Sequence, residues 1–338
     1  MTPLPCKEPT DTAALLDEII AALDRGRRYL ILTHEEPDLD GVGAQLALNE
    51  VLRARGKQVS LWSPSPIPGQ YGFMPGIEHV STDYPAGVGF DVAVALDTAA
   101  LSRLGDAPPL TAADVPVLVN IDHHESNECF GTLNWVNPAA SSVGEMLYGL
   151  FERWGVTLSR EIAVCLYASI VTDTGGFSFS NTTPRALQVA AALVEHGADP
   201  FTLWQQISGA FSLRRHLLLG RALGTLRLWR NDTVATMRLT QEMLGETHAQ
   251  MDETEHFVQY PRTLRGVHAA ALFREQPDRR RVRVSLRSNV PAVHVGQIAA
   301  RFGGGGHASA AGCTLEGPLD DVERTVVAAI GEVLEAAQ

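Results

Sequence analysis

The chain has 338 residues, and this length favours two domains over one. Hydrophobic residues make up 45% and charged residues 20%, which is ordinary for a water-soluble protein with a packed core. The net charge of −12 argues against a protein that coats long nucleic acids through a global basic field. It leaves room for a short anionic substrate held by metals and a local arginine cluster.

Neither a membrane span nor a secretory signal is expected from the sequence. No stretch approaches the roughly 20 apolar residues that cross a bilayer. The start of the chain, expected to be a disordered lead-in, lacks a basic region followed by an apolar one. Cys6, Cys129, Cys165 and Cys313 show no CxxC spacing, so thiols of a cytoplasmic protein are expected rather than a zinc knot or a disulfide framework.

The first half of the chain alternates strand-like and helix-like segments. Short apolar runs end in polar residues at Tyr29–His34, at Asp91–Asp97 and in "VPVLVNIDHH". Between the first two lie "GVGAQLALNEVLRARG", which is apolar at helical spacing and ends at Gly56, and the strand candidate "KQVSLW". Continuous apolar strands that alternate with helices predict an α/β fold with a doubly wound, mainly parallel sheet covered on both faces.

Two later helix starts carry capping signals. Ser142 and Glu145 in "SSVGE" have capping-box spacing. Thr183 can cap a helix whose first position is Pro184. Both signals serve structure first.

A smaller α/β domain is predicted after a helical connector. The segment "HGADP" breaks the alternating pattern, and a largely helical stretch to about Trp229 follows. The strand candidates "TVATMRL", "VHAAALF" and "RVRVSLR", a run of four glycines and an amphipathic helix over about Leu319–Ala336 complete the chain. The predicted boundaries are 11–195 for the first domain, 196–230 for the connector and 231–338 for the second domain.

The second domain contains a basic segment on an acidic protein. From Arg262 to Arg301 there are nine arginines against Glu275 and Asp278, a local net charge of about +7. We expect an anion to bind here, with arginines spread over solvated faces as the alternative.

Acids and histidines gather at the ends of the predicted strands. Four segments contain them: "THEEPDLDG" with His34, Asp38 and Asp40, "DVAVALD" with Asp97, "NIDHH" with Asp122, His123 and His124, and "IVTDTGGF" with Asp173. Three of the four lie where doubly wound sheets bind ligands, outside the carboxyl ends of strands. Alone, an Asp-x-Asp pair is usually a turn, an Asp at a strand end a helix cap, and a His pair surface sequence. Together along one alternating half, they predict a metal site.

The chemistry of these residues favours divalent cations. Adjacent residues on a strand point to opposite faces, but a turn after the strand can bring His123 and His124 to one rim. Clustered carboxylates repel each other and burial raises their pKa values, whereas bound cations reverse that penalty. Oxygen ligands with a minority of imidazoles suit Mn²⁺ or Mg²⁺, and this set is large enough for two ions.

These motifs resemble a known family. The "DHH" after an apolar strand, with "HEEPDLD", "ALD" and "TDTGGF", resembles the DHH phosphoesterase superfamily. The later "RFGGGGHASAAG" resembles the nucleic-acid-binding DHHA1 domain that often follows it. The matches run in the expected order from about Tyr29 to Gly312, and with "RVRVSLRS" they point to the NrnA-type subfamily. Its members are nanoRNases that also remove the 3′-phosphate from 3′-phosphoadenosine 5′-phosphate (pAp).

The resemblance implies a division of labour. Six residues would hold two metals: His34, Asp38 and Asp97 for one ion, and Asp40, Asp97, His123 and Asp173 for the other, with Asp97 bridging. Asp122 would orient an imidazole, and His124 would face the substrate phosphate. Nucleotide binding in the second domain would fall to Arg287, Gly304, Gly305, Gly306 and His307. The glycines would let backbone N–H groups approach an oxyanion, and a flexible helix terminus after "IAARF" is the alternative.

The chain departs from the family pattern beside its first motif. Members often have "PDGDA" where this chain has "PDLDG", so Leu39 replaces a glycine. The ligand positions are intact, and the departure bears only on the local turn. The "SRLG" after Asp97 makes Arg103 a further candidate for phosphate contact in catalysis, with a surface salt bridge as the alternative.

The resemblance implies a metal-dependent phosphodiesterase. It would degrade short oligoribonucleotides (nanoRNA) to mononucleotides, remove the 3′-phosphate of pAp and use two divalent cations, Mn²⁺ ahead of Mg²⁺. A cytoplasmic location and no membrane partner are expected, and a homodimer is left open. The alternatives are a cyclic-di-AMP or pApA phosphodiesterase, a RecJ-like single-strand exonuclease, a DHH-class pyrophosphatase, and a catalytically dead nucleotide sensor. An OB-fold-sized region is missing for RecJ, and a pyrophosphatase would lack the glycine-histidine motif.

Overall fold

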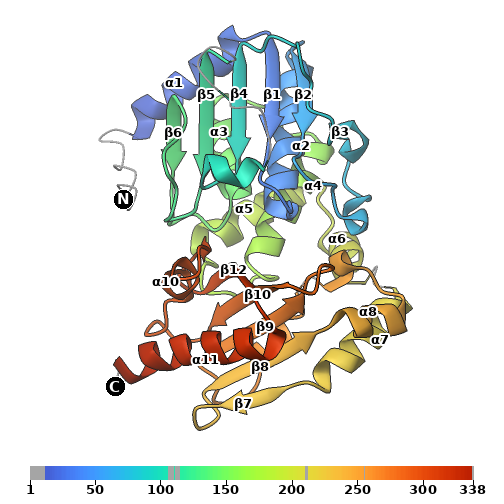
Figure 1. The fold of residues 1–338 in the computed structure, drawn as a ribbon. Coiled ribbons are helices and arrows are strands. Elements are labelled where there is room, and N and C mark those ends of the chain that lie inside the picture. Colours follow the sequence, from blue (N-terminus) through green and yellow to red (C-terminus); the bar gives the residue numbers. More distant parts are fainter. Residues whose placement is uncertain (1–11, 106–109, 111–114, 210–211, 255, 337–338) are drawn as a thin grey trace. The chain divides into compact units, whose positions relative to one another are not determined.

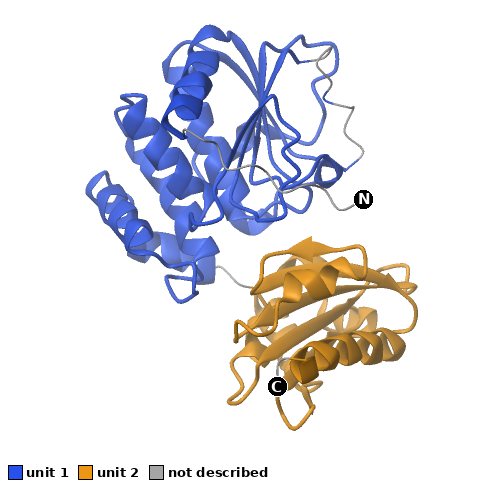
Figure 2. Cartoon of the chain, turned by 90° about the vertical axis from the view of Figure 1, so that its left-hand side faces the viewer, with its two compact units in different colours: residues 1–210 blue, residues 211–338 orange. Residues whose placement is uncertain are grey.

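The computed structural model describes residues 12–105, 110, 115–209, 212–254 and 256–336. Figure 2 shows its two compact units, residues 1–210 and 211–338, and each is described by itself. The division falls inside the segment 196–230 that the sequence suggested as a connector. The expected lead-in at residues 1–11 lies outside the described residues.

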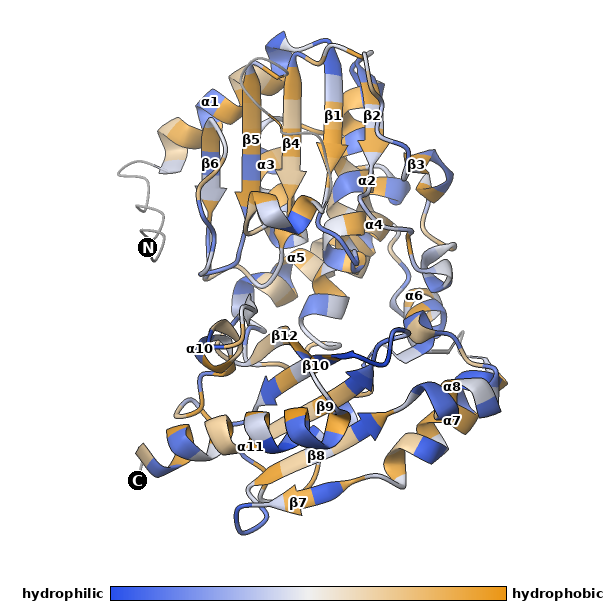
Figure 3. Ribbon diagram, in the orientation of Figure 1, coloured by the Kyte–Doolittle hydropathy of each residue, from blue (hydrophilic) through white to orange (hydrophobic). Residues whose placement is uncertain are grey.

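A six-stranded parallel sheet organises the first unit (Figure 1). Its strands, in order across the sheet, are β3 (Val80–Ser81), β2 (Gln58–Trp62), β1 (Arg28–Leu32), β4 (Val92–Leu96), β5 (Val117–Asp122) and β6 (Leu133–Val136). Every neighbouring pair is parallel. Because both faces of such a sheet are covered, strands can be apolar at every position, and β4 is buried throughout. Figure 3 shows β4 and β5 coloured mainly apolar. The predicted parallel sheet is confirmed.

The strand order reverses between β1 and β4. The chain runs from β1 outward to β2 and β3, and then returns to place β4 on the other side of β1. The connections that leave the carboxyl ends of β1 and β4 therefore diverge, which opens a crevice at that edge of the sheet. The topology thus fixes the place where a ligand site is expected.

Helices cover one face of this sheet, and loops cover the other. The helices of the first unit are α1 (Thr12–Arg25), α2 (Leu39–Ala54), α3 (Val143–Arg153), α4 (Arg160–Asp173), α5 (Pro184–Glu195) and α6 (Pro200–Gly209), with the short 3₁₀ turns η1 (Gly69–Tyr71), η2 (Ile77–His79) and η3 (Leu101–Leu104). Tyr29 and Ile31 face the helices. Leu30 and Leu32 face the second cluster, where Leu104 of η3 packs. This division follows the two-residue period of β1.

The predicted helix caps are present, with one difference in detail. The Oγ atom of Ser142 accepts the N–H of Glu145 at 3.1 Å and begins α3. In a complete capping box the carboxylate of Glu145 would accept the N–H of the cap residue, Ser142. Here it accepts the N–H and the hydroxyl of Ser141, one residue earlier. Thr183 caps α5, whose first residue is Pro184, as predicted.

A mixed six-stranded sheet organises the second unit. Its order is β11 (Gly305–Gly306), β12 (Ala310–Glu316), β10 (Arg281–Ser288), β9 (Ala269–Glu275), β8 (Val234–Leu239) and β7 (Arg227–Trp229). The β8–β9 pair is parallel, and the other pairs are antiparallel. The three predicted strands are confirmed as β8, β9 and β10. The expectation of helix up to Trp229 was wrong at its end, because β7 pairs with β8 there.

The helices of the second unit complete its core. They are α7 (Leu213–Leu223), α8 (Gln241–Thr247), α9 (Gln259–Arg262), α10 (Val295–Ala300) and α11 (Leu319–Ala336), with the 3₁₀ turn η4 (Met251–Thr254). The last helix has the predicted bounds and buries Val322, Val326 and Ile330 on one face. Figure 3 shows apolar and polar residues alternating along it.

The structure bears on the expected state of the cysteines and on the search for membrane spans. Cys165 and Cys313 are free and buried, whereas Cys129 is disulfide-bonded, which corrects the expectation of thiols throughout. Every helix among the described residues falls short of the length or hydropathy of a membrane span.

Candidate metal centre

The crevice between β1 and β4 holds a first group of three side chains. His34 and Asp38 follow β1, and Asp97 follows β4. The Nε2 atom of His34 lies 3.5 Å from Oδ2 of Asp97 and 4.0 Å from Oδ1 of Asp38. Their ligand atoms lie within 4.8 Å of one another, which is close enough for one ion to contact all three.

A second group lies on the other side of the same aspartate. Nε2 of His123 is 3.5 Å from Oδ2 of Asp40, 3.6 Å from Oδ1 of Asp97 and 3.7 Å from Oδ2 of Asp173. These residues come from α2, from the ends of β4 and β5, and from the last residue of α4. The two oxygens of Asp97 thus face different histidines. The structure brings together all six residues that the sequence nominated as metal ligands.

Asp97 has the features of a carboxylate that lacks its partner. Its side chain is 3% exposed, and no hydrogen bond to its Oδ1 is present among the described residues. Burial, together with the neighbouring Asp40 and Asp38, raises the pKa of Asp97 well above its ordinary 3.8. Its backbone is left-handed, with φ of 55°, an uncommon conformation that concentrates at functional sites. A divalent cation would satisfy the oxygen and offset the repulsion, so the donor set fits a metal.

The two histidines of this centre are oriented by backbone carbonyls. Nδ1 of His34 lies 2.7 Å from the Glu35 carbonyl, and Nδ1 of His123 lies 3.3 Å from the Ala140 carbonyl. A proton on each Nδ1 donates to the carbonyl and leaves the Nε2 lone pair facing the carboxylates, as metal-bound histidines usually do. Burial lowers the pKa of His34, which favours the neutral imidazole that a metal requires.

Asp40 is held by a helix N-terminus that the sequence did not connect with it. Its carboxylate accepts the N–H groups of Val143 at 2.9 Å and Gly144 at 3.2 Å, at the start of α3. The Ser169 hydroxyl donates to the same carboxylate at 2.5 Å. Free N–H groups at a helix start favour a negative charge. In the sequence, "SSVGE" indicated the start of this helix but not its contact with Asp40. No sequence pattern indicated Ser169.

Asp122 forms the centre of a buried network beside the candidate metal ligands. It accepts from Nδ1 of His124 at 2.8 Å and from the amide of Asn127 at 2.6 Å. Burial alone would raise its pKa, but His124 and Asn127 outweigh burial and lower the pKa of Asp122 to about 2. The contact with His124 is the one expected of a residue that orients an imidazole. The sequence analysis did not single out Asn127.

Arg103 lies behind the first histidine. From η3 its guanidinium approaches Oε1 of Glu35 at 3.5 Å and donates to the Glu35 carbonyl at 3.3 Å. It also lies 3.1 Å from Nδ1 of His34, the ring nitrogen remote from the carboxylates. The ion pair named as the alternative is thus present, and the catalytic assignment stays a prediction.

Two of the four glycines in the run of the second unit form a short strand. Gly305 and Gly306 form β11 and pair with Gly312 and Ala311 of β12. A Cβ atom on Gly304 would lie 2.1 Å from the Gly312 carbonyl oxygen, so a larger residue does not fit there. Gly305 and Gly306 thus pair within the sheet, and the predicted approach of their N–H groups to an oxyanion stays a prediction.

The remaining substrate candidates lie nearby in the same sheet. Arg287 of β10 pairs in register with Ala310 of β12, and the N–H of His307 donates to the Ala310 carbonyl at 2.7 Å. Backbone register therefore brings both to one region of the second unit. Their role in nucleotide binding stays a prediction.

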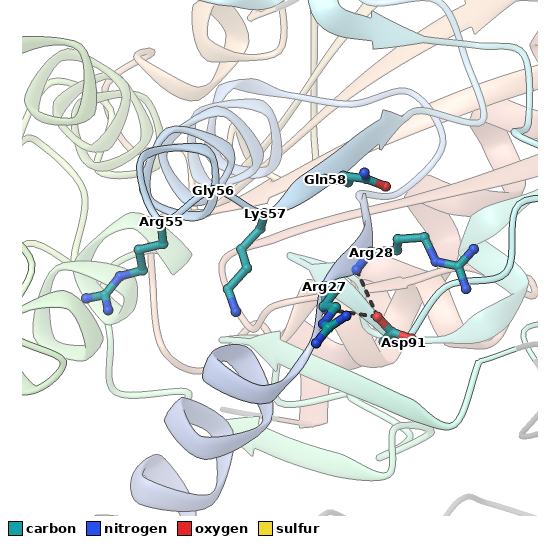
Figure 4. Close-up of a pocket in the computed structure, with 7 residues that line it drawn as sticks. All are labelled: Arg27, Arg28, Arg55, Gly56, Lys57, Gln58 and Asp91. Carbon is teal, nitrogen blue, oxygen red and sulfur yellow. Dashed lines mark hydrogen bonds between the residues drawn. The ribbon is translucent and has the colours of Figure 1, made fainter.

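A separate basic pocket of about 640 Å³ lies at the opposite edge of the first sheet. It is lined by Arg27, Arg28, Arg55, Gly56, Lys57, Gln58 and Asp91, at the amino ends of β1, β2 and β4. Figure 4 shows the side chains of Arg28 and Arg55 pointing in opposite directions. Lys57 donates to the carbonyl of Asp24, in the last turn of α1, and to that of Gly26, just after the helix. Lys57 therefore supports the end of α1, and the clustered acids and histidines lie at the other edge of the sheet.

Comparison with known families divides the chain in the same way. Residues 28–170 match the family model described as "DHH family, N-terminal domain", and residues 231–336 match the model described as "DHHA1 domain". The first match contains every candidate metal ligand except Asp173.

Relatives with known names cover nearly the whole chain. The chain is 34% identical over 331 residues to the "Bifunctional oligoribonuclease and PAP phosphatase NrnA" of Thermus thermophilus, which covers 96% of this chain and 94% of that protein. It is 28% identical to the protein of that name from Bacillus subtilis, over 88% and 92% of the two chains. The crystal structure of an exopolyphosphatase-related protein from Bacteroides fragilis superposes with a TM-score of 0.88 at 26% identity, over 98% and 99% of the two chains.

Proposed function

Because the chain belongs to the DHH family of phosphoesterases, with a DHHA1 domain after the catalytic one, we propose that it is an oligoribonuclease that also removes the 3′-phosphate of pAp. One observation carries the proposal. Acids and imidazoles from three other segments of the chain gather around the carboxylate of Asp97. The substrates follow from the relatives in Thermus and Bacillus, whose names state both activities.

Metal dependence is a property of this family, and the proposed ions are two Mn²⁺, with Mg²⁺ as the alternative. His34, Asp38 and Asp97 would hold one. The other would be held by Asp40, Asp97, His123 and Asp173. When bound, such ions activate water near neutral pH and neutralise charge on the phosphate.

The chain's own residues would position the substrate and its proton transfers. Asp122 fixes the tautomer of His124 by accepting from Nδ1, so that Nε2 is the nitrogen available to a phosphate oxygen. A protonated His124 would donate to the leaving oxygen, and the buried Asp122 would stabilise that proton on the ring. Arg287, His307 and the glycines of β11 would hold the rest of the nucleotide.

The proposal includes a cytoplasmic location and leaves the homodimer open. A cyclic-di-AMP or pApA phosphodiesterase remains the second candidate, because the chain is also 27% identical, over 96% of its length, to the "Cyclic-di-AMP phosphodiesterase GdpP" of Geobacillus thermodenitrificans. The two candidates differ in whether linear nanoRNA or the cyclic dinucleotide is hydrolysed faster.

The test is a substrate panel with the purified full chain and Mn²⁺. The panel contains 5′-labelled RNA from dinucleotides to long strands, pAp and cyclic di-AMP, with Asp97→Ala as the control variant. Mononucleotides from the shortest RNAs and phosphate from pAp, both lost on chelation, are the expected result. Faster cleavage of long RNA than of dinucleotides would refute the proposal, and faster cleavage of cyclic di-AMP would favour the second candidate.

A further inference from the structure

Helix α6 has an anchoring face and a separate aromatic face. Leu203 is 5% exposed, and Ile207, four residues later, also packs against the core of the first unit. Phe201 and Trp204, three residues apart, are 73% and 45% exposed. Leu203 and Ile207 thus anchor one face of the helix, while Phe201 and part of the Trp204 ring remain exposed on another.

The indole of Trp204 lies on the turn that follows Asp173. A Cβ atom added to Gly176 would be 3.0 Å from Cη2 of Trp204, so the ring rests on the glycine backbone. Gly176 has a φ of 68°, and its N–H donates to the Val171 carbonyl at 2.7 Å, which folds the turn back on α4. Three Cα–Cα steps separate Gly176 from Asp173, which bounds their separation at about 11 Å. The backbone under the indole therefore lies within about 11 Å of the Cα atom of a candidate metal ligand.

We propose that Trp204 is a stacking platform for a base of the substrate whose phosphate is hydrolysed beside Asp173. This inference rests on the function proposed above. An aromatic ring accepts any base, because every base has a π-face, and this suits an enzyme that degrades short RNA regardless of sequence. An indole with one side resting on a glycine offers a rigid, partly desolvated surface at little entropic cost. Gly176 is then required for more than its turn, since a side chain there would displace the ring.

The experiment compares two substrates that differ only in their bases. One is the dinucleotide pApA, and the other has the same ribose-phosphate chain without bases. Trp204→Ala should raise KM for pApA by roughly 5- to 150-fold, the range measured for the loss of one stacked base. The abasic substrate should be hydrolysed equally by the variant and the wild type. Trp204→Phe should recover most of the loss.

Controls separate stacking from folding. Leu187→Ala on α5 removes an apolar side chain with a similar exposure of 49%, and its kinetics should match the wild type. Thermal melts should show that Trp204→Ala is folded. The effect should fall on KM with little change in kcat, because a platform holds the base in the ground state and the transition state alike.

Two results would overturn the inference. They are an unchanged KM for pApA in Trp204→Ala, and an equal loss of activity on the abasic substrate. Failure of the proposed function has a different signature, since the wild type itself would then hydrolyse neither pApA nor pAp. In that case the binding of pAp, measured by calorimetry, tests the role of Trp204 without catalysis. The inference stands only if Trp204→Ala binds pAp at least about 5-fold more weakly than the wild type does.

Discussion

Replacing Gly144 by alanine tests whether the start of α3 is shaped around Asp40. A Cβ atom at this position would lie 2.0 Å from Oγ of Ser169 and 2.7 Å from its Cβ, closer than atoms can approach. The hydroxyl that must move accepts the N–H of Gly144 at 2.9 Å and donates to Asp40 at 2.5 Å. The substitution therefore affects packing and the support of a buried carboxylate together.

The balance of three effects gives the expected magnitude. Alanine in a helix interior is favoured over glycine by up to about 1 kcal/mol. Forcing atoms into a filled core costs about 1–3 kcal/mol. Leaving a buried polar group without its hydrogen bond costs a further ~1–3 kcal/mol. The net loss of unfolding free energy is roughly 1–6 kcal/mol. A loss of about 3 kcal/mol lowers the melting temperature of a unit of this size by roughly 6–12 °C.

The assay is differential scanning calorimetry of the full chain with chelator, so that metal binding does not contribute. Gly149 provides the matched control, because it lies in the same helix and an added Cβ meets no atom within 4 Å. Gly149→Ala should raise the melting temperature by about 2–4 °C at most. A Gly144→Ala protein that melts at or above the wild type would refute the steric reasoning.

Three further predictions concern buried charges. Asp97→Asn should abolish Mn²⁺-dependent hydrolysis, yet stabilise the chelated protein at neutral pH. The free energy of unfolding of the wild type in chelator should fall as the pH rises from 3.8 towards the raised pKa of Asp97, by about 1.4 kcal/mol for each pH unit. Thermal melts at several pH values should show that the variant lacks this contribution. Asn127→Ala removes a donor to Asp122 and should lower kcat by roughly 10- to 100-fold while Mn²⁺ still binds by calorimetry. Glu323→Ala leaves Arg238 paired with Asp320 alone and the buried hydroxyl of Thr236 without its acceptor, and should cost about 1.5–3 kcal/mol in urea unfolding. Glu332→Ala, at an exposed ion pair, should cost at most about 1 kcal/mol. Equal urea midpoints for Glu323→Ala and Glu332→Ala would contradict the greater weight given to the buried pair. Full activity in Asn127→Ala would contradict the role given to the network around Asp122.

Local sequence pattern was sufficient to predict the central strands of both sheets, the last helix and the neighbourhood of the site, but not the short edge strands β3, β6 and β7. The apolar runs that became β1, β4 and β5 are buried on both faces, and α11 buries residues at the spacing of one helical face, so local pattern and final packing agree. Because parallel strands present their carboxyl ends at one edge, acids that follow those strands had to come close together. Aspartates 38, 40 and 97 were predictable for this reason.

The groups that support those ligands became visible only in the folded chain. Asp40 contacts Val143 and Ser169, which are 103 and 129 residues away in sequence. Trp204 rests on Gly176 only because α6 packs beside the turn after α4. Such contacts depend on how helices lie on the sheet, and no local period encodes that. A side chain's partner across the core is set by the packing of whole elements, so it cannot be identified until they are assembled.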